Sequence, residues 1–510
     1  MRNNIRLIPM KKKSIPSLIA LALVAISSCK TGATYQEVQI GKATGAKLEA
    51  MGAELDPHFF SQNLTRNDGA KEEDWKLVEK RVKLMELQKF RVMVQPQWFE
   101  PVNDNTNPHQ TDFSKFTFDS PEMKSLYKVL DIAQENGMAV CIVIWGCPVH
   151  VAPLDPNYSH VKTSFMADPS KKDVWITGPT DYDEWAENYS ALIKHLVEDR
   201  KYTCVNEITP MNEPDGGPLL TSTEYIKMAK VLDARFKKDG LRDKIRFNLS
   251  DNTDTRTFYL EDCAANLTEE ADIFNSHTYI FGYDTPNDTI FKWEHNNVNI
   301  SKKAGKRHLV GEFGSNQTVG ATRQKDIDLY ERGVLMTRLV LNFFNAGASG
   351  VSYWSLIDQY YGRDASYEQM QQLGLWKYVK EAYKGDSTYN RIKEDYELRP
   401  QYYAYSLLTK YLKPDAEIYP LDLKDDFAIG TAFKNVDGKW VYVLSNGSKE
   451  DRSLSIFNDQ STGKFSIFRY EENKLPKTDE LISSTESSHA KDGKIKLNLP
   501  KNSMLLIKQD

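Results

Sequence analysis

Two glutamates lie in short contexts that are typical of strand ends. The stretch "VNEITPMNEPDGG", from Val205 to Gly217, holds Glu213 after a β-branched run, and "LVGEFGS" holds Glu312 at the end of another apolar run. A protonated carboxyl and an ionised one can together cleave a glycosidic bond, because one protonates the leaving oxygen while the other attacks the anomeric carbon. The pair predicts this chemistry if the fold brings both groups together.

Further polar and aromatic residues stand where other apolar runs stop. They are Arg91, Trp145, Asn212, His277, Tyr279 and Trp354. In a two-carboxylate site an arginine and a tyrosine hydroxyl can keep the nucleophile ionised, while a negative neighbour raises the pKa of the acid. Structural interpretations stay open for single residues. Glu213 could cap a helix, Glu312 could form an ion pair, Trp354 could be core, and Arg91 or His277 could serve a buried ion pair or hydrogen bond.

The elements that must position these residues alternate regularly along the chain. Apolar runs such as "FRVMVQ" and "MAVCIVIW" follow amphipathic stretches such as "EDWKLVEKRVKLMELQK" and "PEMKSLYKVLDIAQENG". Eight such strands, counted from "LEAMGAEL", predict a (β/α)8 barrel over residues 48–412, with the active site at the carboxyl ends of the strands. A doubly wound open sheet is the alternative, but no glycine-rich phosphate loop follows the first strand.

After residue 412 the pattern changes to short strands separated by turn residues. "AIGTAFK", "KWVYVLSNG", "SLSIFN", "KFSIFRY", "KIKLNL" and "SMLLIK" predict a β-sandwich over residues 413–510. The segment 30–47 contains "YQEVQI", a strand that we expect to join this sandwich. The sandwich could instead be a sugar-binding module, but its strands hold few aromatics that could be exposed beyond Trp440, Tyr442 and Tyr470, which favours a structural role.

Residues 1–29 are predicted to be an export signal. Three lysines after Met10 precede an apolar run that is too short to span a bilayer, and the run ends in "ISSC" at Cys29. This ending resembles a lipobox, so we expect lipidation of Cys29 and anchoring at a bacterial cell envelope. A plain cleaved signal peptide is the alternative. The remaining cysteines show no Cys-x-x-Cys spacing, which argues against a zinc site.

The composition excludes some partners. The chain has 510 residues, a formal charge of −5 and 27% charged residues, so it offers no electrostatic case for nucleic acid or for direct binding to an anionic membrane. No cofactor motif is present, and the chemistry of two carboxylates requires no metal. The expected partner is an oligosaccharide or polysaccharide, and the oligomeric state is not readable from sequence.

Taken in order, the strand-end residues resemble those of clan A of the glycoside hydrolases, which includes families 5, 30 and 39. The resemblance spans residues 48–412, and the terminal sandwich is similar to that of families 30 and 39. It implies that Glu213 is the acid/base, that Asn212 contacts the sugar 2-hydroxyl, and that Glu312 is the nucleophile with Tyr279 as its hydrogen-bond partner. Arg91 resembles the arginine of the second strand, and Trp354 resembles the tryptophan that floors the sugar site. The match of Trp145 is weaker, because "WGCP" does not fit a family pattern.

The sequence therefore predicts a retaining glycosidase for β-linked glycans. An inactive barrel that binds glycans and a transglycosidase are the alternatives. Long loops after Trp145 and Trp354 carry aromatic and basic residues suited to sugars, and these loops favour action at chain ends over an open cleft. The residues are Trp175, Tyr360, Tyr361, Arg363, Trp376 and Tyr378.

Overall fold

Eight parallel strands form a closed barrel in the computed structural model, which describes residues 34–57, 70–149, 163–171, 174, 176–253, 257–316, 324–363, 368–377 and 396–510. The order around the barrel follows the chain, and pairing of the last strand with the first closes it. The strands are β2 (Ala50–Glu54), β3 (Lys89–Val94), β4 (Ala139–Ile144), β7 (Val205–Thr209), β8 (Arg246–Asn252), β9 (Ile273–Ile280), β10 (Arg307–Ser315) and β11 (Gly350–Tyr353). The predicted (β/α)8 fold is confirmed.

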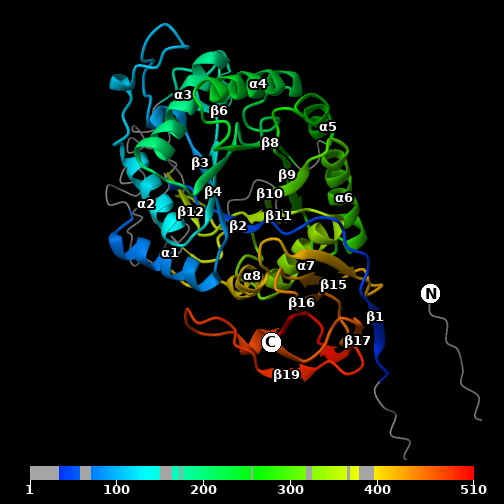
Figure 1. Ribbon diagram of the computed structural model, residues 1–510. Coiled ribbons are helices and arrows are strands. Elements are labelled where there is room, and N and C mark those ends of the chain that lie inside the picture. Colours follow the sequence, from blue (N-terminus) through cyan, green and yellow to red (C-terminus); the bar gives the residue numbers. More distant parts are fainter. Residues whose placement is uncertain are drawn as a thin grey trace, which may run out of the picture. The chain divides into compact units, whose positions relative to one another are not determined.

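A ring of helices surrounds the strands (Figure 1). Helix α6 lacked a sequence prediction because its buried face is largely polar, with Asn287, Glu294, Asn297 and Ser301 turned inward. Such a face gives only weak hydrophobic periodicity. The helices are α1 (Glu72–Met85), α2 (Pro121–Glu135), α3 (Tyr182–Lys194), α4 (Ser222–Lys238), α5 (Thr257–Asn266), α6 (Asn287–Lys303), α7 (Glu331–Ala346) and α8 (Pro400–Tyr411).

Local sequence explains where several helices begin. Ser120 accepts a hydrogen bond from the Met123 amide at the start of α2, and Asp181 caps α3. Thr221 and Glu224 form a capping box on α4. Each cap satisfies amide groups that a helix leaves unpaired at its first turn. The helix starts are thereby anchored close to the carboxyl ends of the preceding strands.

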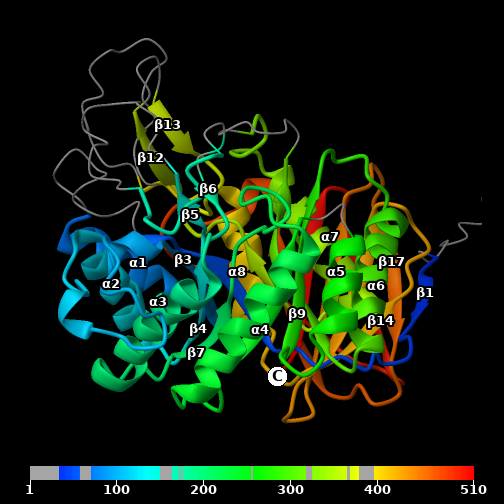
Figure 2. The same ribbon diagram turned by 90° about the horizontal axis from the view of Figure 1, so that it is seen from above.

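Two small hairpins extend the barrel on the side of the strands' carboxyl ends. The hairpin β5 (Cys147–Pro148) with β6 (Ile176–Thr177) follows β4, and the hairpin β12 (Gln359–Arg363) with β13 (Glu368–Gln371) follows β11. Figure 2 shows both hairpins projecting from the same face of the barrel. Both of the loops that were predicted to be long therefore emerge where a substrate would approach.

The C-terminal region is a sandwich of a six-stranded and a three-stranded sheet. The N-terminal strand β1 (Gln36–Gln39) pairs in parallel with β17, so both ends of the described chain contribute to the sandwich. This predicted sandwich is confirmed, although two of its strands, β14 and β19, lacked a prediction. The other strands are β14 (Glu417–Leu421), β15 (Ala428–Lys434), β16 (Trp440–Asn446), β17 (Arg452–Phe457), β18 (Lys464–Tyr470), β19 (Glu486–His489), β20 (Lys494–Leu499) and β21 (Ser503–Gln509).

The six-stranded sheet is buried on both faces at its strand β16. On β16, Val441 and Val443 belong to the core shared with the barrel, whereas Tyr442 and Leu444 belong to the core between the two sheets. This alternation follows from the period of two along a strand. Trp440, Tyr442 and Tyr470 are all buried, so none of these three rings is exposed for stacking on a sugar.

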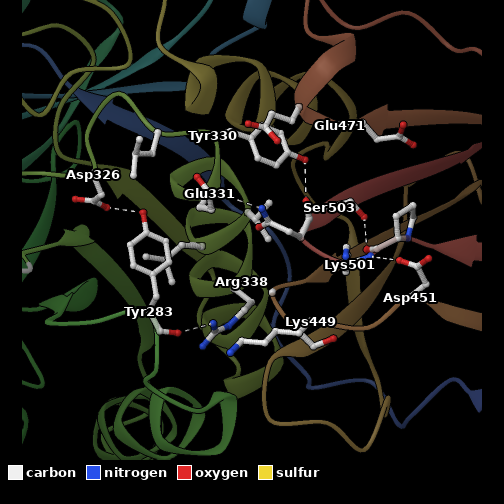
Figure 3. A pocket seen from close by; sticks show the side chains of 18 of the residues that line it. Tyr283, Asp326, Tyr330, Glu331, Arg338, Lys449, Asp451, Glu471, Lys501 and Ser503 are labelled. Atoms are coloured by element: carbon white, nitrogen blue, oxygen red, sulfur yellow. Dashed lines mark hydrogen bonds between the residues drawn. The ribbon is translucent and has the colours of Figure 1, made fainter.

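Helix α7 and strand β18 join the barrel to the sandwich. The rings of Tyr330 and Tyr470 stack with centroids 4.6 Å apart, and each hydroxyl donates to the other residue's carbonyl oxygen. Beside this contact lies a groove of about 1020 Å³ that is lined from both domains, with Tyr283 and Arg338 on one side and Lys449 and other sandwich residues on the other (Figure 3). Residues 35–510 form one compact unit.

Two further observations concern the described residues alone. The cysteines at positions 141, 147, 204 and 263 are buried and unbridged. No helix in the described part of the chain has the length and apolarity needed to cross a bilayer. Cys29 and the signal segment lie outside the described residues.

Candidate active site

Most of the candidate residues lie at the carboxyl ends of barrel strands. Arg91 is in β3, His277 and Tyr279 are in β9, and Glu312 is in β10. The strand that precedes Glu213 is shorter than predicted, because β7 ends at Thr209 and Glu213 lies in the turn beyond it.

The backbone around two site residues is strained. Glu213 has φ of 38° and Asp251 has φ of 53°, which is the left-handed region that side chains with a Cβ rarely adopt. Such strain persists only where the surrounding structure enforces it, and it occurs often at functional sites. Here the Glu213 carbonyl accepts a hydrogen bond from the Gly216 amide at 2.8 Å, which closes the turn. The turn directs the Glu213 side chain back over the barrel.

Glu213 and Glu312 face each other across the barrel mouth. Single atoms of Glu213, His277 and Glu312 lie within 4.8 Å of one another. The two carboxylates differ in environment, because the Glu213 side chain is 30% exposed and the Glu312 side chain is only 6% exposed. One carboxylate can thus exchange protons with solvent, while the other is enclosed.

Arg91 is the hub that holds several of these groups. Its Nη1 donates to Glu54 at 2.9 Å and to Glu312 at 2.6 Å. Its Nη2 donates to the amide oxygen of Asn212 at 2.8 Å and to Asp251 at 2.6 Å. The guanidinium is buried and both of its terminal nitrogens are engaged by protein. Arg91 therefore positions its neighbours through both terminal nitrogens, and its direct contact with a sugar stays a prediction.

Glu312 is held by three groups. Besides Arg91, the Tyr279 hydroxyl donates to its Oε2 at 2.8 Å, and His277 Nδ1 lies 3.5 Å from the same oxygen. Burial raises the pKa of Glu312 to about 7, while His277 and Arg91 oppose the rise and the charge of Glu213 adds to it. The expectation that the arginine and tyrosine keep this pKa low is therefore modified, since desolvation outweighs the favourable partners.

His277 lies between three carboxylates and is fully buried. Its Nδ1 is 2.9 Å from Glu213, and its Nε2 is 3.2 Å from Asp251. Burial by itself would lower the pKa of His277, but Glu312 and Asp251 raise it well above its usual range. A protonated imidazole can donate from both ring nitrogens to these two carboxylates. His277 therefore orients Glu213.

Two buried acids in this network were missed by sequence reasoning. Glu54 ends β2 and Asp251 lies near the end of β8, and both accept from Arg91. Burial raises the pKa of Glu54 well above its usual range, against the pull of Arg91. Burial would raise the pKa of Asp251 too, but Arg91 and His277 hold it below its usual value. The rule that selected the other strand-end residues, a polar residue where an apolar run stops, would have found both.

The aromatic candidates are less closely tied to the two glutamates. Trp145 and Trp354 are buried just after β4 and β11, and the Trp354 amide donates to the Phe313 carbonyl next to Glu312. Their contact with a sugar stays a prediction. Trp376 is fully buried with Arg81 over its ring, so it fastens its loop. Trp175 and Tyr378, and the side chains of Tyr360, Tyr361 and Arg363, lie outside the described residues.

Glu213, His277 and Glu312 are close enough to one another to coordinate a single metal ion, so their fit to a metal can be tested. A histidine ligates a metal only as the neutral imidazole. Here both ring nitrogens of His277 already face carboxylates, Glu213 at 2.9 Å and Asp251 at 3.2 Å, so neither nitrogen is left open toward an ion. The arrangement fits proton transfer by an accessible carboxyl and attack by an enclosed carboxylate.

Comparisons with known proteins locate the fold. No model of a known protein family matches this chain, and no curated protein matches its sequence. Solved structures do match. The catalytic domain of GH30 xylanase C from Talaromyces cellulolyticus superposes with a TM-score of 0.63 at 15% identity, covering 93% of this chain and 99% of that one.

Two further structures are similar. A GH39 β-xylosidase from Caulobacter crescentus has a TM-score of 0.58 at 13% identity, with 93% of this chain and 100% of that chain covered. An α-L-arabinofuranosidase from Thermotoga maritima has a TM-score of 0.57 at 12% identity, with 93% and 99% covered. The superposition includes barrel and sandwich together. The chain therefore has the fold of the clan A glycoside hydrolases.

Proposed function

We propose that this chain, with its clan A glycosidase fold, is a retaining glycoside hydrolase that cleaves β-linked glycans. The observation that carries the proposal is the placement of Glu213 and Glu312, whose carboxylates approach within 4.8 Å across the barrel mouth. Retaining enzymes hold their two carboxyl groups about 5 to 5.5 Å apart, whereas inverting enzymes need a wider gap for water.

In this proposal Glu312 is the nucleophile and Glu213 is the acid/base. Glu312 accepts one hydrogen bond from Arg91 on Oε1 and one from Tyr279 on Oε2. These two bonds hold the carboxylate facing Glu213 across the barrel mouth. Glu213 is partly exposed, so it can reload a proton between the two steps. Asn212 has its amide oxygen occupied by Arg91, so its amide nitrogen is the group that meets a sugar hydroxyl.

The reaction proceeds in two steps. Glu312 attacks the anomeric carbon while Glu213 protonates the leaving oxygen, and a covalent glycosyl-enzyme forms. Glu213 then accepts a proton from water, which attacks the same carbon and releases Glu312. His277 holds Glu213 in place through both steps, because its Nδ1–H donates to that carboxylate.

The stereochemical outcome tests this function directly. A panel of aryl β-glycosides would first identify a substrate that the protein hydrolyses. The panel should begin with xylosides, because two of the similar structures are a xylanase and a β-xylosidase. Proton NMR during the first turnovers should show the β-anomer before mutarotation. An α-anomer first would mean inversion and would overturn the roles of Glu213 and Glu312. If the protein bound some of these glycosides but hydrolysed none of them, the result would favour an inactive glycan-binding barrel.

The location of the protein is part of the proposal. The signal-like segment that ends at Cys29 supports export and lipid anchoring at a cell envelope. Labelling cells with a radioactive fatty acid should mark the parent chain, and Cys29→Ser should lose the label. A parent chain that carries no fatty acid would favour a plain cleaved signal.

A further inference from the structure

A second acidic cluster lies outside the barrel mouth. Oxygen atoms of Glu100, Asp104 and Glu184 all lie within 4.8 Å of one another; Glu100 and Glu184 are buried, and Asp104 is 9% exposed. Glu100 and Asp104 belong to the segment that follows β3, and Glu184 is in the first turn of α3. Among the described residues, no lysine or arginine forms an ion pair with any of the three. The cluster therefore brings together three carboxyl groups that have no cationic partner in the described part of the chain.

Buried oxygen atoms in this cluster lack hydrogen-bond donors in the described part of the chain. They include Asp104 Oδ1, Glu184 Oε1 and Asn188 Oδ1. Asn188 is fully buried on α3, and its amide nitrogen donates to Glu100 at 2.9 Å, so its amide group lies against the cluster. A buried acceptor without a donor destabilises the folded chain, because it loses its hydrogen bonds to water. Two carboxylate oxygens of the cluster and the amide oxygen of the adjoining Asn188 are thus buried without donors, which points to a bound cation that oxygen atoms would coordinate.

We propose that Glu100, Asp104 and Glu184, with the amide oxygen of Asn188, bind a Ca²⁺ ion that fastens the segment after β3 to helix α3. Calcium takes carboxylate and amide oxygens at about 2.4 Å, so ligands on opposite sides of the ion are up to about 4.8 Å apart. Magnesium usually keeps several waters and one or two carboxylates, so a set of three carboxylates and an amide oxygen favours calcium. The site is separate from Glu213 and Glu312, so the inference does not depend on the proposed function.

The rest of the segment is arranged to hold these ligands in place. Asp104 uses its other oxygen to accept from the Asp112 amide, and its own amide donates to Glu100 at 3.3 Å. Farther along the segment, Phe118 stacks on His195 at the end of α3 with ring centroids 3.9 Å apart. The segment is thus attached to α3 near Phe118, and the ion adds a second attachment near Glu184. Loss of the ion should loosen the loop and leave the barrel intact.

Terbium luminescence tests the site, because Tb³⁺ replaces Ca²⁺ and emits when a nearby tryptophan is excited. Trp185 adjoins Glu184, and Trp98 precedes Glu100 by two residues. The full chain, freed of metal with a chelator, should bind Tb³⁺ with emission that Ca²⁺ competes away and Mg²⁺ does not. Glu184→Gln and Asp104→Asn should each weaken binding by about tenfold or more, since a charged ligand is lost. Asp183→Asn is the matched control, because Asp183 lies in the same turn outside the cluster, and it should bind as the parent does.

Thermal unfolding supplies a second readout. Saturating Ca²⁺ should raise the Tm of the parent by on the order of 3 °C and leave Glu184→Gln unchanged. Three results would overturn the proposal. Glu184→Gln and Asp104→Asn could both bind Tb³⁺ as tightly as the parent does, or Tb³⁺ binding could be lost in Glu312→Gln instead. Alternatively, the parent could show neither Tb³⁺ binding nor a change of Tm with Ca²⁺. The last result would mean that the carboxylates share protons.

Discussion

At the residue scale, Glu213 and Glu312 carry the same side chain but lie in different environments. Glu312 is enclosed and receives hydrogen bonds from Arg91 and Tyr279, whereas Glu213 is partly exposed and is contacted by His277. Identical side chains acquire different roles when their environments separate their protonation states. Arg91 and His277 stabilise this arrangement, because together they contact at least four carboxylates whose mutual repulsion would otherwise be unbalanced.

Glu312→Gln should remove nearly all hydrolysis of an activated aryl glycoside. An amide cannot form the glycosyl ester, so we expect a loss of roughly 10³-fold or more in kcat. A fluorosugar inactivator should label Glu312 in the parent, as mass spectrometry of the digested protein would show. Glu261→Gln, an exposed acid on α5, is the control and should retain full activity. Labelling at another residue would contradict the assignment.

Glu213→Ala should discriminate between leaving groups. A poor leaving group needs protonation and a good one does not, so the loss in kcat should be far larger for an alkyl or unsubstituted phenyl glycoside than for a dinitrophenyl one. Added azide should restore part of the activity and yield a β-glycosyl azide. An equal loss on every leaving group, without an azide product, would indicate a purely structural Glu213.

The pH profile should report the ionisation of Glu312. Its pKa is raised to about 7, so the fraction of ionised nucleophile falls as the pH drops through 7, and kcat/KM should fall with it. The charge of Glu213 contributes to that raised value. Glu213→Gln should therefore shift the acidic limb to lower pH when the substrate is a dinitrophenyl glycoside, which needs no acid. A limb that does not move in this variant would show that another group controls it.

At the element scale, helix α7 packs closely on the sandwich at one glycine. A Cβ placed on Gly333 would lie 2.3 Å from the Tyr470 hydroxyl, which is closer than real atoms approach. Alanine in a helix interior normally stabilises by about 0.5 to 1 kcal/mol relative to glycine. Here Gly333→Ala should instead destabilise by about 1 to 3 kcal/mol through overpacking, measured by denaturant unfolding.

A double-mutant cycle provides the control for this substitution. Tyr470→Leu removes the ring that the new methyl group would meet. In that background Gly333→Ala should cost clearly less than in the parent, because contacting residues are not additive. The same cost in both backgrounds would mean that the strain lies elsewhere in α7.

At the scale of the whole molecule, the barrel and the sandwich share one core. Deleting residues 413–510 would uncover the side of the barrel that contacts the six-stranded sheet, and it would leave β1 without β17. We expect the truncated chain to be insoluble, because a large contiguous apolar patch promotes association. A chain that starts at Thr34 and keeps the sandwich is the control and should stay soluble. A soluble, active fragment 34–412 would show that the sandwich is dispensable.

Several active-site residues could be predicted from the sequence, because the parallel strands of a barrel have all their carboxyl ends on one face. Any polar residue where an apolar run stops is therefore a candidate, and Glu213, Glu312 and Tyr279 were found in this way. Helix α6 was missed because its inward face is polar, and the short strands β14 and β19 have little apolar content to mark them.

Local periodicity in the sequence showed where apolar runs stop, and this placed Glu213 and Glu312 near strand ends, although β7 ends at Thr209 and Glu54 at the end of β2 was missed. Only the tertiary structure decided what those residues do for one another, because contacts such as Arg91 to Asp251 join positions far apart in the chain. The pKa of Glu312 was likewise decided by tertiary structure, since burial and neighbouring charges set it together. The cluster of Glu100, Asp104 and Glu184 was invisible in the sequence for the same reason: its members are ordinary acids until the fold of the segment after β3 brings them against α3.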